Sequence, residues 1–373
     1  MAQGEKMKAE KEQNQNTQVL TGIAEPLLEW YKNHARVLPW RERPEPYRVW
    51  VSEIMLQQTR VEAVKPYYER FLSALPSIAA LAEVPEDRLL KLWEGLGYYS
   101  RARNLQKAAQ KVMQEYGGAL PASYEQLKSL PGIGEYTAGA IASIAFGIAV
   151  PVVDGNVLRV ISRITGSFEQ VDTAACKKRI WKELAQIMPG DAPGDFNQAL
   201  MELGATVCLP NGAPLCGNCP LAERCSARAN GWIQCIPVRA PKKQKKVEHY
   251  TVLLLWQDGK IALQRRQERG LLAGMWQFPS LDGWLSREET EQELVRRGAE
   301  ILETRPAGQA QHIFTHIIWK MNGFCIFLKQ PPSWEGLQFW EPQEMLEKAA
   351  LPAAFRHYTA LVQKTAEQEK REE

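Results

Sequence analysis

Two kinds of hydrophobic pattern divide the chain. From about Val19 to Asn230, apolar residues recur at three- and four-residue spacing, and turns are marked by Pro and Gly. This pattern predicts a region built almost entirely of helices. From about His249 onward the period changes, and the segments YTVLLLWQ, KIALQRR and HIFTHIIWKMNGFCIFL are typical of strands, with one helical segment, EETEQELVRRG, among them. The second region is therefore predicted to be a smaller α+β domain.

These patterns predict an ordered division of the 373 residues. Polar termini without an apolar core are typical of disordered tails, and the Lys- and Pro-rich RAPKKQKK (239–246) is typical of a solvated linker. The expected division is a disordered tail at 1–18, a helical domain at 19–230, a linker at 231–248, an α+β domain at 249–365 and a charged tail at 366–373.

Composition narrows the class of protein without naming a function. With 45% hydrophobic and 24% charged residues the chain has the balance of a soluble globular protein. The first eighteen residues lack the apolar core of a signal peptide, and no later segment is long and apolar enough to cross a membrane. We therefore expect a cytoplasmic protein. A net charge of +3 is too small to establish a nucleic-acid partner.

Four cysteines, Cys208, Cys216, Cys219 and Cys225, fall within the stretch CLPNGAPLCGNCPLAERC. In a reducing compartment, structural disulfides are disfavoured, so a tight cysteine cluster predicts a metal site. Four thiolates can bind zinc or hold a [4Fe-4S] cluster, and the spacing alone does not choose between them. The three other cysteines stand alone in the sequence and are expected to be buried or incidental.

The stretch SLPGIGEYTAGAIA (129–142) predicts a tight hairpin between two helices. Gly132 and Gly134 carry no side chain and can adopt positive φ, so backbone N–H groups at the next helix start can approach an anion closely. This geometry suits a phosphate grip that does not depend on DNA sequence. An ordinary turn between helices is the alternative interpretation.

Two carboxylates have different predicted surroundings. Glu53 lies among apolar helical residues, so burial should raise its pKa and keep it protonated as a general acid. A solvated flank of the helix is the alternative. Asp154 precedes the helical NVLRVISRI and should cap that helix, where N–H groups and the helix dipole favour the ionised form. A purely structural cap is possible, but such a pair suits cleavage of a glycosidic bond through an oxocarbenium-like transition state.

Three segments together resemble a known family. The LPGIG hairpin, LPWRERPEPYRVWVSEIMLQQTRV (38–61) and VPVVDGNVLRVISRI (150–164) are similar to the adenine DNA glycosylase (MutY) branch of the helix-hairpin-helix glycosylases. The resemblance implies that Glu53 protonates the leaving adenine and that Asp154 stabilises the sugar cation, with Tyr136 and Asn156 in support. Relatives that also cut DNA carry lysine where this chain has Tyr136, so base removal without strand cleavage is expected.

The same resemblance assigns residues to DNA. It places Arg36, Trp40, Arg41 and Gln198 around the extruded adenine. It places Gln58, Thr59, Leu96 and Tyr98 at the duplex, together with Gly132 and Gly134 of the hairpin. For LGYY (96–99) alone, the end of a core helix is the alternative interpretation.

The region 249–365 resembles the Nudix-like C-terminal domain of that family, most clearly in GLLAGMWQFPSLDG. The following segment lacks the array of glutamates with which Nudix hydrolases hold magnesium, so a recognition domain without hydrolase activity is expected. Phe314, Thr315 and His316 match the family's Phe-Ser-His loop, which implies recognition of 8-oxoguanine opposite adenine. A strand with one exposed polar residue is the alternative.

The resemblance also favours a [4Fe-4S] cluster over zinc. The cysteine spacing here is seven, two and five, one residue longer at the first interval than in the family, and the loop LPNGAPL could absorb the insertion. Cys235 is a conceivable substitute ligand.

The implied partner is double-stranded DNA with adenine opposite 8-oxoguanine or guanine. A monomer is expected, with no membrane contact, possible replication or repair proteins as partners and, in a bacterium, association with the nucleoid. Two alternatives stay open: another helix-hairpin-helix glycosylase, of the thymine/uracil or endonuclease III type, and a catalytically silent damage-binding protein.

Overall fold

A computed structural model describes residues 18–241 and 244–372. Contacts between Cα atoms divide the chain into two compact units. Unit 1 contains the described part of Met1–Glu83 together with Asn104–Pro241, and unit 2 contains Val84–Arg103 with Lys242–Glu373. The predicted tail at 1–18 falls almost wholly outside the described residues, and the predicted domain boundaries stay predictions.

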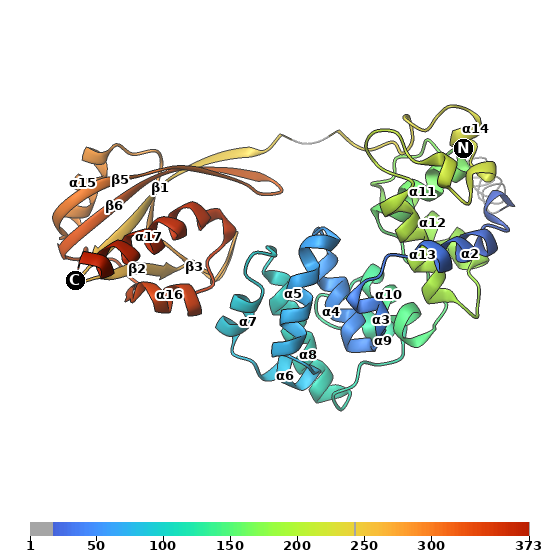
Figure 1. Cartoon of the computed structure of the whole chain (residues 1–373), viewed down its shortest axis with the longest axis horizontal. Helices are drawn as coiled ribbons and strands as arrows, with labels where there is room; N and C mark the ends of the chain where they lie inside the picture. The colour runs from blue at the N-terminus through green and yellow to red at the C-terminus, as the bar shows by residue number, and fades with distance from the viewer. Residues whose placement is uncertain (1–17, 242–243, 373) are drawn as a thin grey trace, which may run out of the picture. The chain divides into compact units, whose positions relative to one another are not determined.

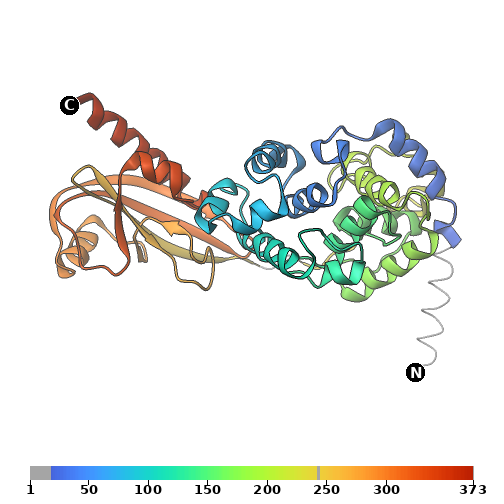
Figure 2. The same cartoon turned by 90° about the horizontal axis from the view of Figure 1, so that it is seen from below.

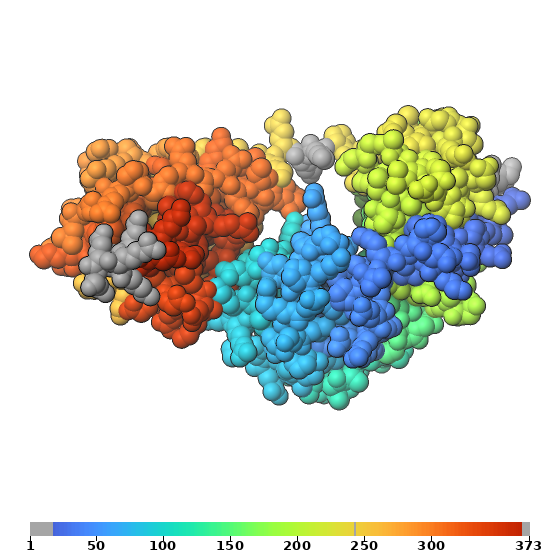
Figure 3. Space-filling view, in the orientation of Figure 1, coloured from blue at the N-terminus to red at the C-terminus, as the bar shows by residue number. Residues whose placement is uncertain are grey.

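Unit 1 is helical, as the pattern predicts. Its helices are α2 (Ala24–His34), α3 (Pro39–Glu42), α4 (Pro46–Leu56), α5 (Val61–Ala74), α6 (Ile78–Glu83), the greater part of α8 (Ser100–Glu115), α9 (Tyr124–Lys128), α10 (Glu135–Phe146), α11 (Gly155–Thr165), α12 (Ala174–Ile187), α13 (Pro193–Thr206), the 3-10 turns η1 (Cys216–Asn218) and η2 (Ala222–Arg224), and α14 (Ser226–Ala229). A buried cluster joins the beginning of the unit to its end, since Leu27 and Trp30 pack with Phe196 and Leu203. Figure 3 shows the N-terminal segment, in dark blue, lying against the yellow-green segments from the end of unit 1.

Helix α11 illustrates how the sequence sets the helix ends. The Asp154 side chain accepts hydrogen bonds from the first free N–H groups, and Gly166 ends the helix with a φ of 70°. A glycine is favoured there because the left-handed conformation is strained for residues with a Cβ. Between the two caps, every residue from Val157 to Ile164 is buried. The cap predicted for Asp154 is therefore present.

The predicted hairpin lies between α9 and α10. Leu130 and Ile133 are buried and anchor the turn, whereas Gly132 and Gly134 are exposed. Gly132 has a φ of 74°, but Gly134, the residue before α10, has a φ of −88°. Gly132 therefore uses the positive φ that glycine allows, whereas Gly134 has an ordinary negative φ. At Gly134 the missing side chain leaves open space beside the start of α10.

The described residues of unit 2 form a seven-stranded mixed sheet. Its strands are β1 (Lys246–Gln257), β2 (Lys260–Arg265), β3 (Trp276–Gln277), β4 (Ser280–Asp282), β5 (Glu300–Ile313), β6 (Ile317–Gln330) and β7 (Leu337–Trp340), and its helices are α7 (Glu86–Leu92), α15 (Arg287–Arg296), α16 (Pro342–Lys348), the 3-10 turn η3 (Ala353–Phe355) and α17 (Arg356–Glu372). The main order is β3-β2-β1-β6-β5, with β4 beside β1 and β7 beside β2. β1 and β6 run parallel, and the other pairs are antiparallel.

The sheet of unit 2 is covered on both faces. Successive side chains of a strand point to opposite faces, and in β1 Leu254 joins a buried cluster with Tyr358 of α17 while Leu253 joins another with Leu294 of α15. Figures 1 and 2 show α17, in red, along one side of the sheet and α15 at the other. This arrangement confirms the predicted α+β class. No helix of the described residues is long and apolar enough to span a membrane.

Candidate active site

Glu53 lies in the buried middle of α4. Its neighbours Val49, Trp50 and Ile54 are part of the core, and the glutamate itself is only 5% exposed. Burial raises the pKa of Glu53 to about 7, an effect that the nearby Asp154 reinforces and that Tyr136 and Arg41 oppose. Its Oε2 has no hydrogen-bond partner among the described residues. Glu53 can thus hold a proton near neutral pH, as its apolar neighbours predict.

Asp154 is held by three hydrogen bonds at the start of α11. Oδ1 accepts from the backbone N–H of Asn156 at 2.9 Å and of Val157 at 2.7 Å, and Oδ2 accepts from Asn156 Nδ2 at 2.8 Å. Burial nevertheless raises the pKa of Asp154, while these hydrogen bonds and Arg159 act in the opposite direction. Desolvation therefore outweighs the hydrogen bonds in the pKa of Asp154, and its action as an ionised carboxylate stays a prediction.

Tyr136 of α10 lies beside both carboxylates. Burial, together with the charges of Glu53 and Asp154, raises the pKa of its hydroxyl well above the usual value, so it stays neutral. The hydroxyl donates to Met201 Sδ at 3.3 Å. Three predicted residues from α4, α10 and the start of α11 are thus brought together.

The predicted base-pocket residues Arg36, Arg41 and Gln198 meet around a residue that the sequence did not indicate. Glu202 of α13 is only 1% exposed and forms ion pairs with Arg36 Nε at 2.6 Å and with Arg41 Nη2 at 2.9 Å. Arg41 Nε also donates to Gln198 Oε1 at 3.2 Å. The spacing of Gln198 and Glu202, one helical turn apart, was the available signal.

The other predicted contacts of unit 1 lie apart from this network. Trp40 is buried with its ring edge-on to Tyr68 at 5.4 Å between centroids. Gln58 follows the C-terminal end of α4, is exposed and has a φ of 58°, an uncommon conformation for a residue with a side chain. Thr59, the next residue, is half-buried and donates to the Gln57 carbonyl.

A second residue missed in the sequence is Arg159. Its Nη2 donates to Asn156 Oδ1 at 2.9 Å and to the Gly204 carbonyl at 2.8 Å, and its Nε donates to the Cys208 carbonyl at 2.8 Å. The buried arginine therefore ties the residue that clamps Asp154 to the first cysteine of the predicted metal site. In the sequence it is one of two arginines in NVLRVISRI with nothing to distinguish it.

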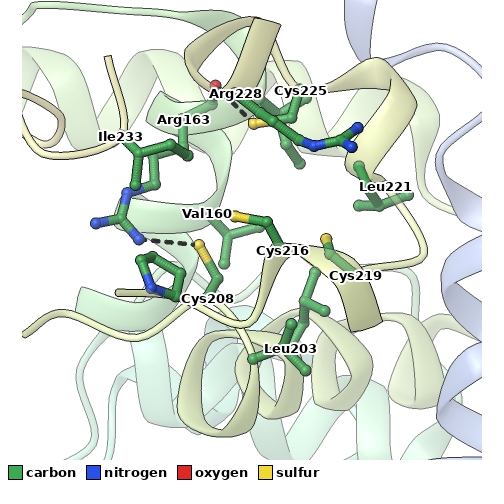
Figure 4. A pocket seen from close by; sticks show the side chains of 14 residues that line it. Val160, Arg163, Leu203, Cys208, Cys216, Cys219, Leu221, Cys225, Arg228 and Ile233 are labelled. Atoms are coloured by element: carbon green, nitrogen blue, oxygen red, sulfur yellow. Dashed lines mark hydrogen bonds between the residues drawn. The ribbon is translucent and has the colours of Figure 1, made fainter. Parts of the chain in front are cut away.

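The four predicted cysteine ligands line one cavity, whose other walls are apolar side chains and the two arginines Arg163 and Arg228. Figure 4 shows Cys208, Cys216, Cys219 and Cys225 around it, with Val160 and Leu203 among the apolar side chains. Arg163 Nη1 donates to Cys208 Sγ at 3.2 Å, and Cys225 Sγ donates to the Arg163 carbonyl at 3.4 Å. Within residues 18–241 and 244–372, no three His, Cys, Asp or Glu side chains are grouped to hold a metal ion.

Unit 2 contains the residues assigned to the opposite base. Tyr98 is 44% exposed, has a φ of 47° and shares a 2.7 Å hydrogen bond with Thr315. Thr315 and His316 are exposed, while Phe314 is half-buried against Trp319 at 4.9 Å between ring centroids. Leu96 is buried, in agreement with the alternative of a core position.

Comparisons with known proteins define the class. Residues 51–186 match the family described as HhH-GPD superfamily base excision DNA repair protein, and residues 251–361 match the NUDIX domain. A solved structure described as a thermostable thymine-DNA glycosylase superposes with a TM-score of 0.52 and 29% identity, covering 58% of this chain and 98% of that one. The helical unit is thus that of a helix-hairpin-helix base-excision repair protein.

Curated relatives narrow the class to one family. An adenine DNA glycosylase of Homo sapiens is 37% identical over 90% of this chain and 73% of its own length. Another, of Buchnera aphidicola subsp. Baizongia pistaciae, is 34% identical over 82% of this chain and 86% of its own. The chain belongs to the adenine DNA glycosylase family, which confirms the resemblance drawn from its motifs.

Proposed function

We propose that the protein hydrolyses the N-glycosidic bond of adenine placed opposite 8-oxoguanine or guanine in duplex DNA. The observation that carries the proposal is the pair of buried carboxylates in different settings: Glu53, whose Oε2 has no hydrogen-bond partner in the part of the chain that the structure describes, and Asp154 with three donors. Two carboxyl groups whose environments differ can divide the roles of acid and cation stabiliser.

Glu53 acts as the general acid in this mechanism. With a pKa of about 7 it carries a proton in much of the population at neutral pH and can give it to a ring nitrogen of the leaving adenine. As the bond to the sugar breaks, the electron pair leaves with the base. Arg36, Arg41 and Gln198 hold the extruded base, and the buried Trp40 belongs to the same proposed pocket.

Asp154 faces the sugar as positive charge develops there. Its two oxygens are fixed by Asn156 and Val157, so the carboxylate needs little reorganisation when the cation forms. Tyr136 offers no amine for a Schiff base, and its neutral hydroxyl stays beside the carboxylates. Water then adds to the sugar carbon and passes its proton to the carboxylate left on Glu53, so the expected product is an abasic site in an unbroken strand.

Recognition of the opposite base belongs to unit 2. The Tyr98 and Thr315 hydroxyls form a hydrogen-bonded pair at an exposed position, so both remain available to a purine edge. Phe314 is fixed by Trp319 and positions the loop, and His316 follows on the exposed side. Gln58 and Thr59 would contact the duplex from unit 1, and Gly132 and Gly134 would hold a phosphate. Leu96 would support Tyr98 from the core.

The cysteine cavity suits a [4Fe-4S] cluster. The donor set is four thiols, the ligands that such clusters require, and the other walls are mostly apolar. Cys208, Cys216, Cys219 and Cys225 would hold the cluster, and the Arg163 guanidinium would compensate thiolate charge. The bound cluster would supply four iron–sulfur bonds that fix the loop between Cys208 and Cys225. About four irons per chain with visible absorbance supports this ligand group, whereas stoichiometric zinc in a colourless protein contradicts it.

The partner is double-stranded DNA, which a monomer would bind in the cytoplasm or, in a bacterium, on the nucleoid. Contacts with replication or repair proteins and the absence of membrane association belong to the same proposal.

Release of adenine from a defined duplex tests the function. Under single-turnover conditions, the protein should free adenine placed opposite 8-oxoguanine and leave an abasic site that breaks only after alkali. Duplexes with thymine or uracil opposite guanine are the comparison substrates, because unit 1 shares its fold with a thymine-DNA glycosylase structure. Preferential release of thymine, or release of no base, would contradict the proposal.

A further inference from the structure

The Glu202 carboxylate receives four hydrogen bonds from two arginines far away in the sequence. Oε1 accepts from Arg36 Nε at 2.6 Å and from the Arg36 backbone N–H at 3.1 Å. Oε2 accepts from Arg36 Nη2 and from Arg41 Nη2, both at 2.9 Å. Because the carboxylate is buried, burial by itself would raise its pKa, but the two arginines lower it overall. Glu202 is thus a fixed negative charge inside unit 1.

The network continues from Arg41 to Gln198. Arg41 Nε donates to Gln198 Oε1 at 3.2 Å, and Arg41 Nη1 donates to the Arg36 carbonyl at 3.1 Å. A guanidinium can only donate, so the oxygen of the Gln198 amide must face Arg41 and its NH₂ group is left to donate. An NH₂ donor suits the ring nitrogens of adenine, which accept hydrogen bonds. The orientation of Gln198 therefore depends on where Arg41 is held.

The same arginine acts on the general acid. Three groups around Glu53 influence its pKa: Tyr136 of α10 and Arg41 of α3 lower it, and Asp154 at the start of α11 raises it. Two arginines and one glutamate leave one net positive charge in the network. Without the charge of Glu202 the network would carry two, and the ionised form of Glu53 would be favoured more strongly.

We propose that Glu202 is a positioning residue of the base pocket that fixes Arg41, and through it the Gln198 amide, while its charge limits the positive potential at Glu53. This inference rests on the proposed function, since it assigns Glu202 a part in the same adenine-releasing site. The carboxylate acts through Arg41, which donates a hydrogen bond to it and whose charge lowers the pKa of Glu53.

The test is the pH dependence of adenine release by the Glu202→Gln variant. Glutamine has nearly the same shape but no charge, and its NH₂ group opposes the arginine donors. Glu53 works in its protonated form, so the rate falls as pH rises through its pKa. In Glu202→Gln the pKa of Glu53 is lower, so the rate of adenine release begins to fall about half a pH unit or more below the pH at which it falls in the wild type. The rate at low pH also decreases, because the Gln198 amide is no longer fixed.

Two further variants separate charge from structure. Glu202→Asp keeps the charge on a shorter side chain. The rate of adenine release should therefore decrease, while the pH at which it falls should stay that of the wild type. Arg41→Gln removes positive charge from the other side, and its fall moves to higher pH. If Glu202→Gln does not fold, as judged by circular dichroism and thermal melting, this opposite shift tests the link from Arg41 to Glu53 on which the inference depends. The inference is overturned if Glu202→Gln releases adenine more slowly but the rate falls at the same pH as in the wild type. If Glu202→Gln is unfolded, the same result in Arg41→Gln overturns it.

Failure of this inference is distinguishable from failure of the proposed function. The wild type must release adenine, and Glu53→Gln must not, before the Glu202 series has meaning. If the wild type releases no adenine, the function itself is wrong. If adenine release depends on Glu53 but its pH profile does not change with the charge at position 202, only the inference is wrong.

Discussion

Asn156 Nδ2 donates a 2.8 Å hydrogen bond to Asp154 Oδ2, while the backbone N–H of the same asparagine donates to Oδ1 at 2.9 Å. One residue thus holds both oxygens of the carboxylate. The asparagine is itself fixed by Arg159, which donates to Asn156 Oδ1. Because burial raises the pKa of Asp154, these donors are what keeps the carboxylate accessible to ionisation.

Asn156→Ala should therefore change the acidic side of the pH profile. In the proposed mechanism Asp154 stabilises the sugar cation only when ionised, so the rate should rise with pH through its pKa. Removing the side-chain donor raises this pKa and moves the rise to higher pH by about one unit. Single-turnover rates across the pH range measure the shift. If the rate is lower at every pH but rises at the same pH as in the wild type, Asn156 has a purely structural role.

Glu53 should control the other side of the profile. Its pKa of about 7 predicts that adenine release falls as pH rises through neutrality, because the proton donor is lost. Glu53→Gln should reduce release by at least about 100-fold, the usual contribution of a general acid, and should leave binding to the mismatched duplex in place. Glu115→Gln, at an exposed position of α8, is the matched control and should keep the wild-type profile. A Glu53→Gln variant that retains activity would show that another group donates the proton.

The sequence predicted those parts of the site that depend on local pattern. The apolar neighbours of Glu53 predict its burial, and the position of Asp154 before a helical pattern predicts that it caps the helix. Glu202 and Arg159 could not be found this way, because their roles come from partners brought together by folding. Arg36 is 166 residues from Glu202, and Gly204 is 45 residues from Arg159.

The balance of opposing forces also lay beyond the sequence. Asp154 has the cap hydrogen bonds that its position predicts, yet burial outweighs them in its pKa, and burial is a property of the packed unit. The two glycines of the hairpin look equivalent in LPGIG but differ in φ, because Gly132 alone carries the chain through the left-handed region. The local sequence identifies the candidate site residues, whereas tertiary packing determines their pKa values and backbone conformations.

Thr315 should contribute to discrimination more than to catalysis. Thr315→Ala removes the hydroxyl that pairs with Tyr98 and that would contact 8-oxoguanine. One hydrogen bond is worth about 1 kcal/mol, so the preference for adenine opposite 8-oxoguanine over adenine opposite guanine should fall about fivefold. The ratio of the two single-turnover rates measures this preference.

Two further variants distinguish the Thr315 contact with Tyr98 from its proposed contact with 8-oxoguanine. Thr315→Ser keeps the hydroxyl and should keep the preference. Tyr98→Phe removes only the hydroxyl of Tyr98 that is hydrogen-bonded to Thr315. Equal discrimination in Thr315→Ala and the wild type would assign the opposite base to other residues.

The hairpin glycines predict two different failures. In Gly132→Ala the new Cβ would lie 2.6 Å from Asn104 Cβ at a φ of 74°, so the free energy of unfolding should fall by about 1–3 kcal/mol. In Gly134→Ala no atom lies within 4 Å of the new Cβ and the φ of −88° is ordinary, so stability should be retained. DNA affinity should nevertheless drop, because the methyl group occupies the space through which a phosphate approaches the N–H groups that begin α10. Denaturant unfolding and duplex-binding titrations at one fixed salt concentration measure the two effects, and unchanged affinity in Gly134→Ala would exclude the hairpin as the phosphate grip.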